Sequence, residues 1–351
     1  MQSRVTAVIS AGLLIVGATV ARPQKVTQET IQLQRFGFTT GSCESRQTVQ
    51  FLDDNRLLLS APLVGNCDKS NWSSALNTQL TVIDLHGAVL ATKGRPDVYG
   101  IEAGPIGFAA VCTATSLELI SSDLNTARVI STRPSKISPC SGIDGLSPSR
   151  TAISVRDFDE NPKSGTLHRL IVATSDQPLA EQQISKPNFL AGITDSGYGV
   201  CVEHEGCAQL TVDGKVWAGR GGDGRGLFLS PNQMLLPLEP GDKVLMLRFP
   251  DGRRERVADL RGLAPPNVDN PSVQISAVVP RRILYAATGC YIGDFDDCYA
   301  FTIGRVVMLD PQTHQTLFKQ KVSQGAKSIL SPNGHSVVVL DKTKLEIYKI
   351  P

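Results

Sequence analysis

The sequence predicts an all-β fold: a single closed β-propeller of about seven four-stranded blades, with the last blade completed by the N-terminal strand. One observation is the unit from Lys327 to Pro351, which reads as strand, Ser-Pro-Asn-Gly turn, Val-rich strand, polar turn and alternating strand. Another is that weakened copies recur at the roughly 40–50-residue period of propeller blades. A third is that the final unit is one strand short.

The repeat is clearest at the turn between the first two strands of each unit. Pro presets φ for a turn, Asn and Gly accept positive φ, and Ser or Asp can bond the local backbone. The clear copies of this turn are Leu146–Ser149, Leu229–Asn232 and Leu330–Gly334, and the looser ones are Phe51–Asn55, Ile193–Gly197 and Val279–Arg282.

A second and a third strand follow each of these turns. The predicted second strands are Leu57–Ala61, Ala152–Arg156, Gly199–Val202, Met234–Leu238, Ile283–Ala287 and Val337–Leu340. The predicted third strands are Leu80–Leu85, Leu167–Thr174, Ala208–Val212, Val244–Phe249, Phe301–Leu309 and Leu345–Ile350. Asp-Gly turns such as Val212–Lys215 and Pro250–Arg253 then lead to a fourth strand. A further unit fits between Ile106 and Ile130, although its first turn is poor.

The N-terminal segment offers the strand that the final unit lacks. Thr30–Phe36 alternates apolar and polar residues. Pairing beside Leu345–Ile350 would close the ring and remove an exposed sheet edge. The alternative is an unpaired leader strand.

These turn patterns resemble the YVTN/WD40-like superfamily of propeller repeats. The resemblance extends from about Thr48 to the end of the chain and implies a propeller fold. The Gly-His and Trp-Asp pair of strict WD40 repeats is absent, and the resemblance names no narrower family.

Residues 1–21 are expected to be a signal peptide, which leaves residues 22–351 as the propeller domain. Arg4 precedes the apolar run Val5–Val20, and Thr19 and Ala21 fit the spacing of a cleavage site. The alternative is a retained membrane helix, for which the run is short. Removing Arg4 changes the net charge from +2 to +1, which excludes a bulk electrostatic footprint for nucleic acid. We therefore expect a secreted or periplasmic monomer with no membrane span after cleavage.

Eight cysteines in an exported chain favour disulfide bonds. Sequence alone allows 105 pairings. Their positions in the predicted blades narrow the choice, because a bridge needs Cα atoms within about 7 Å. The pairs expected are Cys43–Cys67, Cys112–Cys140, Cys201–Cys207 and Cys290–Cys298, all on the face that carries the loops between second and third strands. The spacing gives little support to a metal site.

The most suggestive loop for ligand binding is Gly289–Cys298 on that face. Its three carboxylates and two aromatic rings offer charge, hydrogen bonding and contact area together. The residues are Tyr291, Asp294, Phe295, Asp296 and Asp297. Calcium is a weaker interpretation because the full ligand spacing is missing, and a solvated hairpin tip is the simplest one.

Two more residues on the same face are candidates for ligand contact. Asp157 begins an acidic loop, and His204 lies inside the small Cys201–Cys207 loop, where it could titrate near neutrality. The simpler interpretation of each is a solvated turn. The Gly-rich segment Gly219–Gly226 has no helix after it and is expected to be a blade connection.

Two classes of function fit this sequence. The first is a binding module that holds a protein, peptide or glycan on the disulfide-stiffened face, because stiff loops lower the ordering cost of binding. The alternative is a propeller enzyme (lactonase-like, lyase-like or quinoprotein-like) with a site at the mouth of the central channel. We expect binding, with no catalytic residue, no cofactor and no metal. Charged residues clustered at the channel mouth would favour the enzyme.

Overall fold

The computed structural model describes most of the 351-residue chain. The described residues are 26–41, 43–63, 75–113, 116–130, 142–157, 165–204, 206–219, 226–236, 244–259, 270–279, 282–292, 298–323 and 326–350. For residues 27, 45, 244, 259, 270–278, 285–292 and 298–303 the description covers the backbone alone. The predicted signal segment lies outside these ranges.

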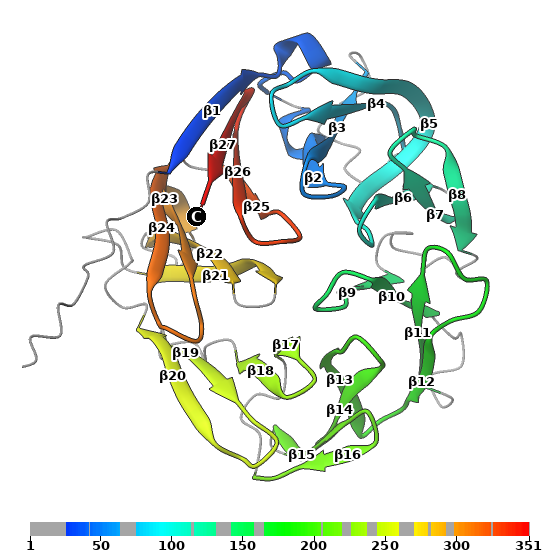
Figure 1. The fold of residues 1–351 in the computed structure, drawn as a ribbon, viewed down its shortest axis with the longest axis vertical. Helices are drawn as coiled ribbons and strands as arrows, with labels where there is room; N and C mark the ends of the chain where they lie inside the picture. The colour runs from blue at the N-terminus through cyan, green and yellow to red at the C-terminus, as the bar shows by residue number, and fades with distance from the viewer. Residues whose placement is uncertain are drawn as a thin grey trace, which may run out of the picture.

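In this part of the chain the strands form six antiparallel sheets (Figure 1). Each sheet is named here by its first strand along the chain. The last sheet is the exception, because it is named after β25 although β1 belongs to it. The β2 sheet contains β2 (Thr48–Phe51), β3 (Arg56–Pro62), β4 (Leu76–Asp84), β5 (Val89–Ala103), β6 (Phe108–Thr113), β7 (Leu117–Ser121) and β8 (Thr126–Ile130). The β9 sheet contains β9 (Ile143–Leu146), β10 (Ala152–Asp157), β11 (Thr166–Val172) and β12 (Ala180–Ile184). The β13 sheet contains β13 (Asn188–Ile193), β14 (Tyr198–Glu203), β15 (Cys207–Val212) and β16 (Lys215–Trp217).

The other three sheets also have four strands each. The β17 sheet contains β17 (Leu227–Ser230), β18 (Gln233–Leu236), β19 (Val244–Arg248) and β20 (Arg254–Asp259). The β21 sheet contains β21 (Asn270–Val279), β22 (Arg282–Ile292), β23 (Cys298–Leu309) and β24 (Thr316–Val322). The β25 sheet contains β25 (Lys327–Leu330), β26 (Ser336–Asp341), β27 (Lys344–Lys349) and β1 (Thr27–Gln32). The predicted second and third strands are therefore present, with ends shifted by a few residues.

The sheets stand around a common centre, with β2, β9, β13, β17, β21 and β25 innermost (Figure 1). Strands within the four-stranded sheets follow one another outward in chain order, and β1 is added at the rim of the last. Antiparallel four-stranded sheets set radially around an axis define a β-propeller. The predicted all-β fold and its propeller-like arrangement of sheets are therefore confirmed.

The seven-stranded sheet results from the length of β5. Residues Val89–Val98 of this strand pair with β4, whereas Val98–Ala103 pair with β6. The first part of β5 is therefore an outer strand, and its last part is the inner strand of the next group. The weak unit Ile106–Ile130 contains the three strands β6, β7 and β8.

The N-terminal strand lies beside the last strand, but it is displaced from its predicted position. Strand β1 pairs antiparallel with β27, from Thr27 opposite Lys349 to Gln32 opposite Lys344. The pairing ends because Leu33 N–H donates to Thr343 O and the chain turns. Residues Gln34–Phe36, which we predicted to continue the strand, form the 3-10 helix η1 before Gly37 at φ +84°. A second 3-10 helix, η2 (Glu44–Arg46), precedes β2.

The hydrophobic cores lie between neighbouring sheets. One cluster joins the β25 sheet to the start of the β2 sheet through residues such as Phe51, Leu57, Val338 and Ile347. Further clusters connect consecutive sheets around the molecule, and another lies between the two groups of strands within the seven-stranded β2 sheet. A distributed core of this kind stabilises a chain longer than a typical single domain. No described helix has the length and apolar character needed to span a membrane.

Candidate ligand-binding site in the central cavity

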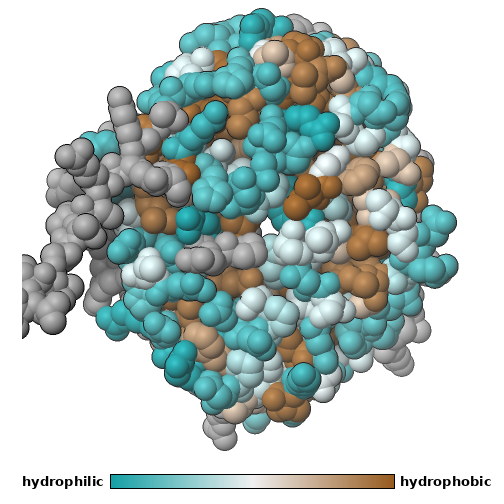
Figure 2. Space-filling model, viewed as in Figure 1, coloured by the Kyte–Doolittle hydropathy of each residue, from teal (hydrophilic) through white to brown (hydrophobic). Residues whose placement is uncertain are grey.

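A cavity of about 490 Å³ lies where the innermost strands meet. Residues of β2, β5, β9, β13, β17, β21 and β25 line it, so each group of strands contributes to the wall. Its volume lies within the roughly 300–1,000 Å³ of typical ligand pockets. On the face that Figure 2 shows, polar residues break the apolar surface into separate patches.

The described lining of the cavity is mostly apolar. Its large members are Phe51, Ile143, Leu146, Leu190, Ile193, Leu227, Phe228, Val279, Ile329 and Leu330. Leu227 is 42% exposed although it belongs to an inner strand. An apolar side chain left open to an internal cavity is suited to contact a ligand.

Two glycines allow the backbone to pack closely at the wall. A Cβ on Gly192 would lie 2.8 Å from Gly226 O, and a Cβ on Gly226 would lie 2.7 Å from Leu235 O. Neither position has room for a side chain, so Gly192 allows β13 to approach the start of β17, and Gly226 allows that segment to approach β18.

Glu102 places a carboxylate at the cavity wall. Among the described residues, no group donates a hydrogen bond to it. Its side chain is exposed to the cavity space while protein surrounds it. This desolvation raises the pKa of the Glu102 carboxyl, and the positive charge of Lys327 opposes the rise. Lys327 in turn donates to Gln47 O at 3.0 Å. Glu102 can therefore accept a hydrogen bond from a ligand.

Arg150 also lines the cavity, but its guanidinium is hydrogen-bonded to backbone carbonyl groups. Its guanidinium donates to Phe51 O at 3.0 Å and Gly104 O at 3.3 Å. Burial lowers the pKa of Arg150 to about 10, and the charge of Asp54 opposes this. The side chain thus ties the turn after β9 to the β2 sheet.

Asp144, on β9, is the centre of a buried polar network. Its Oδ2 lies 2.7 Å from Nδ1 of His168 and accepts from Ser154 Oγ at 3.0 Å, and its Oδ1 lies 3.5 Å from Nε of Arg156. The side chains of Asp144 and His168 are only 4% and 6% exposed. Ser154 Oγ also contacts the Tyr198 hydroxyl at 3.3 Å, which links the network to the β13 sheet. Asp144 is therefore occupied by internal partners.

Most ionisable residues of the described lining are engaged with other parts of the protein. Of the three ionisable residues in the described lining, Asp144 and Arg150 already have partners. General acid–base chemistry usually needs a second positioned group beside Glu102. Within the described ranges, no three metal-ligating side chains come together.

Of the residues that the sequence singled out for ligand contact, the structure describes the side chains of Asp157 and His204 alone, and neither lines the cavity. Nη2 of Arg169 donates to both carboxylate oxygens of Asp157 at 2.8 Å, which forms an ion pair across β10 and β11. His204 is exposed at the tip of the β14–β15 hairpin. Tyr291 is in β22, where only the backbone is described, and Asp294, Phe295, Asp296 and Asp297 lie outside the described residues. Asn71–Ser73, a glycosylation sequon, also lies outside them.

Sequence reasoning missed Glu102 because the turn after it does not match the repeat. The sequence feature that could have indicated Glu102 is an acidic residue within a short apolar run, three positions before Pro105.

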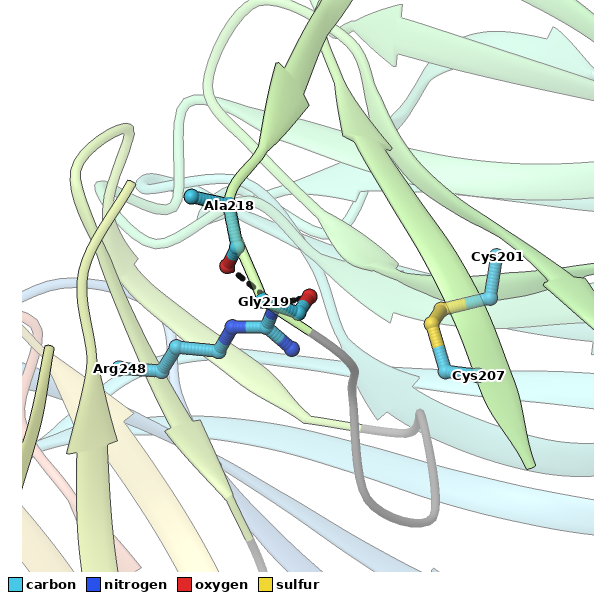
Figure 3. The surroundings of a disulfide bond; sticks show 5 residues. All are labelled: Cys201, Cys207, Ala218, Gly219 and Arg248. Carbon is cyan, nitrogen blue, oxygen red and sulfur yellow. Dashed lines mark hydrogen bonds between the residues drawn. A yellow bond between two sulfur atoms is a disulfide. The ribbon is translucent and has the colours of Figure 1, made fainter. Parts of the chain in front are cut away.

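The predicted Cys201–Cys207 disulfide is present, with Cα atoms 5.3 Å apart (Figure 3). It joins β14 and β15 close to the tip of their hairpin. Figure 3 also shows Arg248 of β19, which is 1% exposed and donates to Ala218 O and Gly219 O of the neighbouring sheet at 2.9 and 2.7 Å. Cys43 and Cys112 are disulfide-bonded as well, but their predicted partners Cys67 and Cys140 lie outside the described residues.

No protein-family model matches the chain, and no curated protein matches it. Among solved structures, a crystal structure of the mitotic checkpoint complex is 12% identical with a TM-score of 0.46, over 98% of this chain and 100% of that one. BamB from Moraxella catarrhalis is 10% identical with a TM-score of 0.40, over 86% and 84%. A member of the DUF4221 family from Bacteroides vulgatus is 10% identical with a TM-score of 0.42, over 94% and 99%. At these TM-scores the propeller assignment rests on the sheet topology alone.

Proposed function

We propose that this protein is an exported binding propeller that holds a small, largely apolar ligand in its central cavity. The observation that carries the proposal is the lining: exposed Leu227 and other apolar residues surround one carboxylate, Glu102, to which no described group donates. Ligand pockets combine such apolar walls with a few polar groups that fix orientation.

The proposed architecture is a closed ring of seven four-stranded blades. The double role of β5 supports the count, because dividing the seven-stranded sheet there gives two four-stranded groups. The pairing of β1 with β27 and the core shared by the first and last sheets support closure. A closed ring leaves the inner strands rigid, which lowers the ordering cost of binding.

Export is supported by the predicted signal segment and the Cys201–Cys207 bridge. The face that carries this bridge is the proposed rim of the entrance, and the acidic loop with Tyr291 and Asp294 is a proposed second contact for a protein, peptide or glycan. We propose a monomer, with no cofactor. The enzyme alternative gains no support from the described lining, which offers no acid–base pair beside Glu102.

The test uses a neutral apolar fluorescent dye, prodan, and a variant that fills the cavity. Leu227→Trp adds volume at a position already open to the cavity. Val216→Trp is the matched control, because Val216 is 61% exposed on the outer strand β16. We expect saturable dye fluorescence with the wild type and the control, and at least roughly tenfold weaker binding with Leu227→Trp, a loss of about 1.4 kcal/mol.

Equal dye affinity in both Trp variants, with unchanged melting temperatures, would show that the cavity is not the binding site. The absence of saturable binding to the wild type would contradict the proposal as well.

A further inference from the structure

Arg150 is the one cationic residue in the described lining of the central cavity. It lies in the turn that follows β9, and its Nη2 donates to Phe51 O at the end of β2 and to Gly104 O just after β5. The guanidinium is therefore held where three inner strands meet. The side chain is only 7% exposed, so its positive charge is surrounded by protein and by the cavity that it lines.

The charge of Arg150 has no ion-pair partner in the described part of the chain. Its hydrogen bonds there use Nη2 alone, and Nε is buried without a hydrogen-bond partner. The charge of Asp54 favours the protonated guanidinium, but Asp54 Oδ1 accepts the backbone N–H of Asn333 instead. Because buried charges in proteins are usually paired, Arg150 is suited to receive a counter-charge from a ligand.

The backbone conformation at Arg150 is a separate indication of a special role. Arg150 has φ +55°, in the left-handed region that favours glycine. The matching turn in the last unit, Leu330–Gly334, has Gly334 at this position with φ +76°. Both turns close in the same way, because Arg150 N–H donates to Ser147 O at 2.8 Å and Gly334 N–H donates to Ser331 O at 2.9 Å. An arginine thus occupies a position that suits glycine, and strained residues of this kind cluster at ligand sites.

Apolar side chains lie on the other side of the cavity. Strands β13 and β17 stand across the centre from β2 (Figure 1), and they contribute Leu190, Ile193 and Leu227 to the lining. A ligand with one charged end and an apolar chain can therefore contact Arg150 and the apolar wall together. A carboxylate complements the guanidinium in charge and in its planar arrangement of acceptors.

We propose that the ligand of the central cavity is an aliphatic monocarboxylate whose carboxylate accepts a hydrogen bond from Arg150. This assignment rests on the proposed function, since it names the class of apolar ligand that the cavity holds. The aliphatic chain extends toward Leu227, and Glu102 accepts from any donor group elsewhere on the ligand. Because Glu102 carries the opposite charge in the same lining, a cationic ligand is the competing class.

The competing role for Arg150 is to tie its turn to the neighbouring strands and nothing more. Arg248 provides the comparison, because its Nη2 also donates to two backbone carbonyl groups, Ala218 O and Gly219 O, and its Nε is also buried without a partner. Arg248 does not belong to the described lining of the cavity. The two arginines therefore share a hydrogen-bond pattern and differ in their access to a ligand.

Isothermal titration calorimetry at pH 7 with octanoate, 1-octanol and octylamine separates the ligand classes. The three probes have the same chain and carry a negative, a neutral and a positive end. We expect octanoate to bind saturably and at least about tenfold more tightly than the other two, because hydrogen bonds between charged groups are the strongest. Equal affinities would overturn the proposal, and tighter binding of octylamine would assign the preference to Glu102 instead.

Variants of the two arginines test the role of the guanidinium. Arg150→Gly removes it and leaves a residue suited to the φ of the turn. This variant should bind octanoate at least about tenfold more weakly, with a much smaller change for 1-octanol. Arg248→Gln is the matched control and should bind octanoate as the wild type does. Arg150→Gln should show the same loss and serves if the glycine variant does not fold. Unchanged octanoate affinity in the Arg150 variants, or an equal loss in Arg248→Gln, would overturn the proposal.

The results distinguish a failure of this assignment from a failure of the proposed function. Prodan binding together with equal affinities for the three octyl probes would refute the carboxylate class and leave the proposed function intact. Octanoate binding that persists in Leu227→Trp would place the anion outside the central cavity and refute the assignment. No binding of prodan or of any octyl probe would refute both.

Discussion

The backbone N–H of Asn333 donates to Oδ1 of Asp54, 2.8 Å away, although 279 residues separate them. The bond joins the first turn of the β25 sheet to the first turn of the β2 sheet. A similar bond connects two later sheets, where Ser149 N–H donates to Asp195 Oδ1 at 2.9 Å. Turns of neighbouring sheets are therefore tied to each other at two places around the molecule.

Asp54→Ala is expected to lower the free energy of unfolding by about 1 kcal/mol, because Asn333 loses its acceptor. Urea unfolding measures the change. Asp54→Asn is the control, since it keeps an acceptor oxygen and should lose less. Equal stability of the alanine variant and the wild type would show that this bond does not hold the first and last sheets together.

Asp144→Ala is expected to destabilise the protein by about 3 kcal/mol, because its buried partners His168 and Ser154 lose their acceptor. Asp157→Ala provides the comparison on the same sheet. Its ion pair with Arg169 is about a quarter exposed (side chains 24% and 23%), so we expect a loss below about 1 kcal/mol. Chemical denaturation of both variants measures their losses of unfolding free energy. Similar losses would show that the greater burial of Asp144 does not make it more important for stability than Asp157.

Glu102→Gln is expected to stabilise the protein at pH 7. Burial raises the pKa of Glu102 above its ordinary value of 4.5, so the folded state binds the proton more tightly than the unfolded state. The ionised carboxylate then costs stability as the pH rises from 4.5 through the folded-state pKa, and the cost stays constant above it. The gain should be below about 1 kcal/mol, because solvent in the cavity screens the charge and attraction to Lys327 is lost.

Melting temperatures at pH 4 and pH 7 measure this effect. The variant should melt above the wild type at pH 7, and the difference should shrink at pH 4, where the wild-type carboxyl is mostly protonated in both states. A variant less stable than the wild type at pH 7 would mean that Lys327 outweighs desolvation.

A Cys290–Cys298 disulfide is expected from the strand register. In the β14–β15 hairpin, Cys207 lies opposite Glu203, two residues after Cys201. In the β22–β23 hairpin, Cys298 lies opposite Ile292, two residues after Cys290. The first pair is bridged, and the second has the same offset. Non-reducing peptide mapping should recover a linked Cys290–Cys298 peptide, and either cysteine linked elsewhere would contradict it.

The sequence by itself determined the local parts of this fold. The Ser-Pro-Asn-Gly turn and the Val-rich run after it predicted β26, and the copies predicted the other second and third strands, because turn chemistry and period-2 alternation act within a few residues. The Cys201–Cys207 bridge was predictable for the same reason, since one hairpin contains both residues.

Only the tertiary structure decided the rest. The end of β1 depends on Thr343, which accepts from Leu33 across the junction of the two chain ends. Glu102 lines the central cavity because it lies in the last part of β5, which is the inner strand of its group, whereas the first part of β5 is the outer strand of the preceding group. The Asp144–His168 contact spans 24 residues and joins β9 to β11, which lie on either side of β10 in the sheet. These features arise from long-range pairing and burial, which a local sequence pattern does not encode.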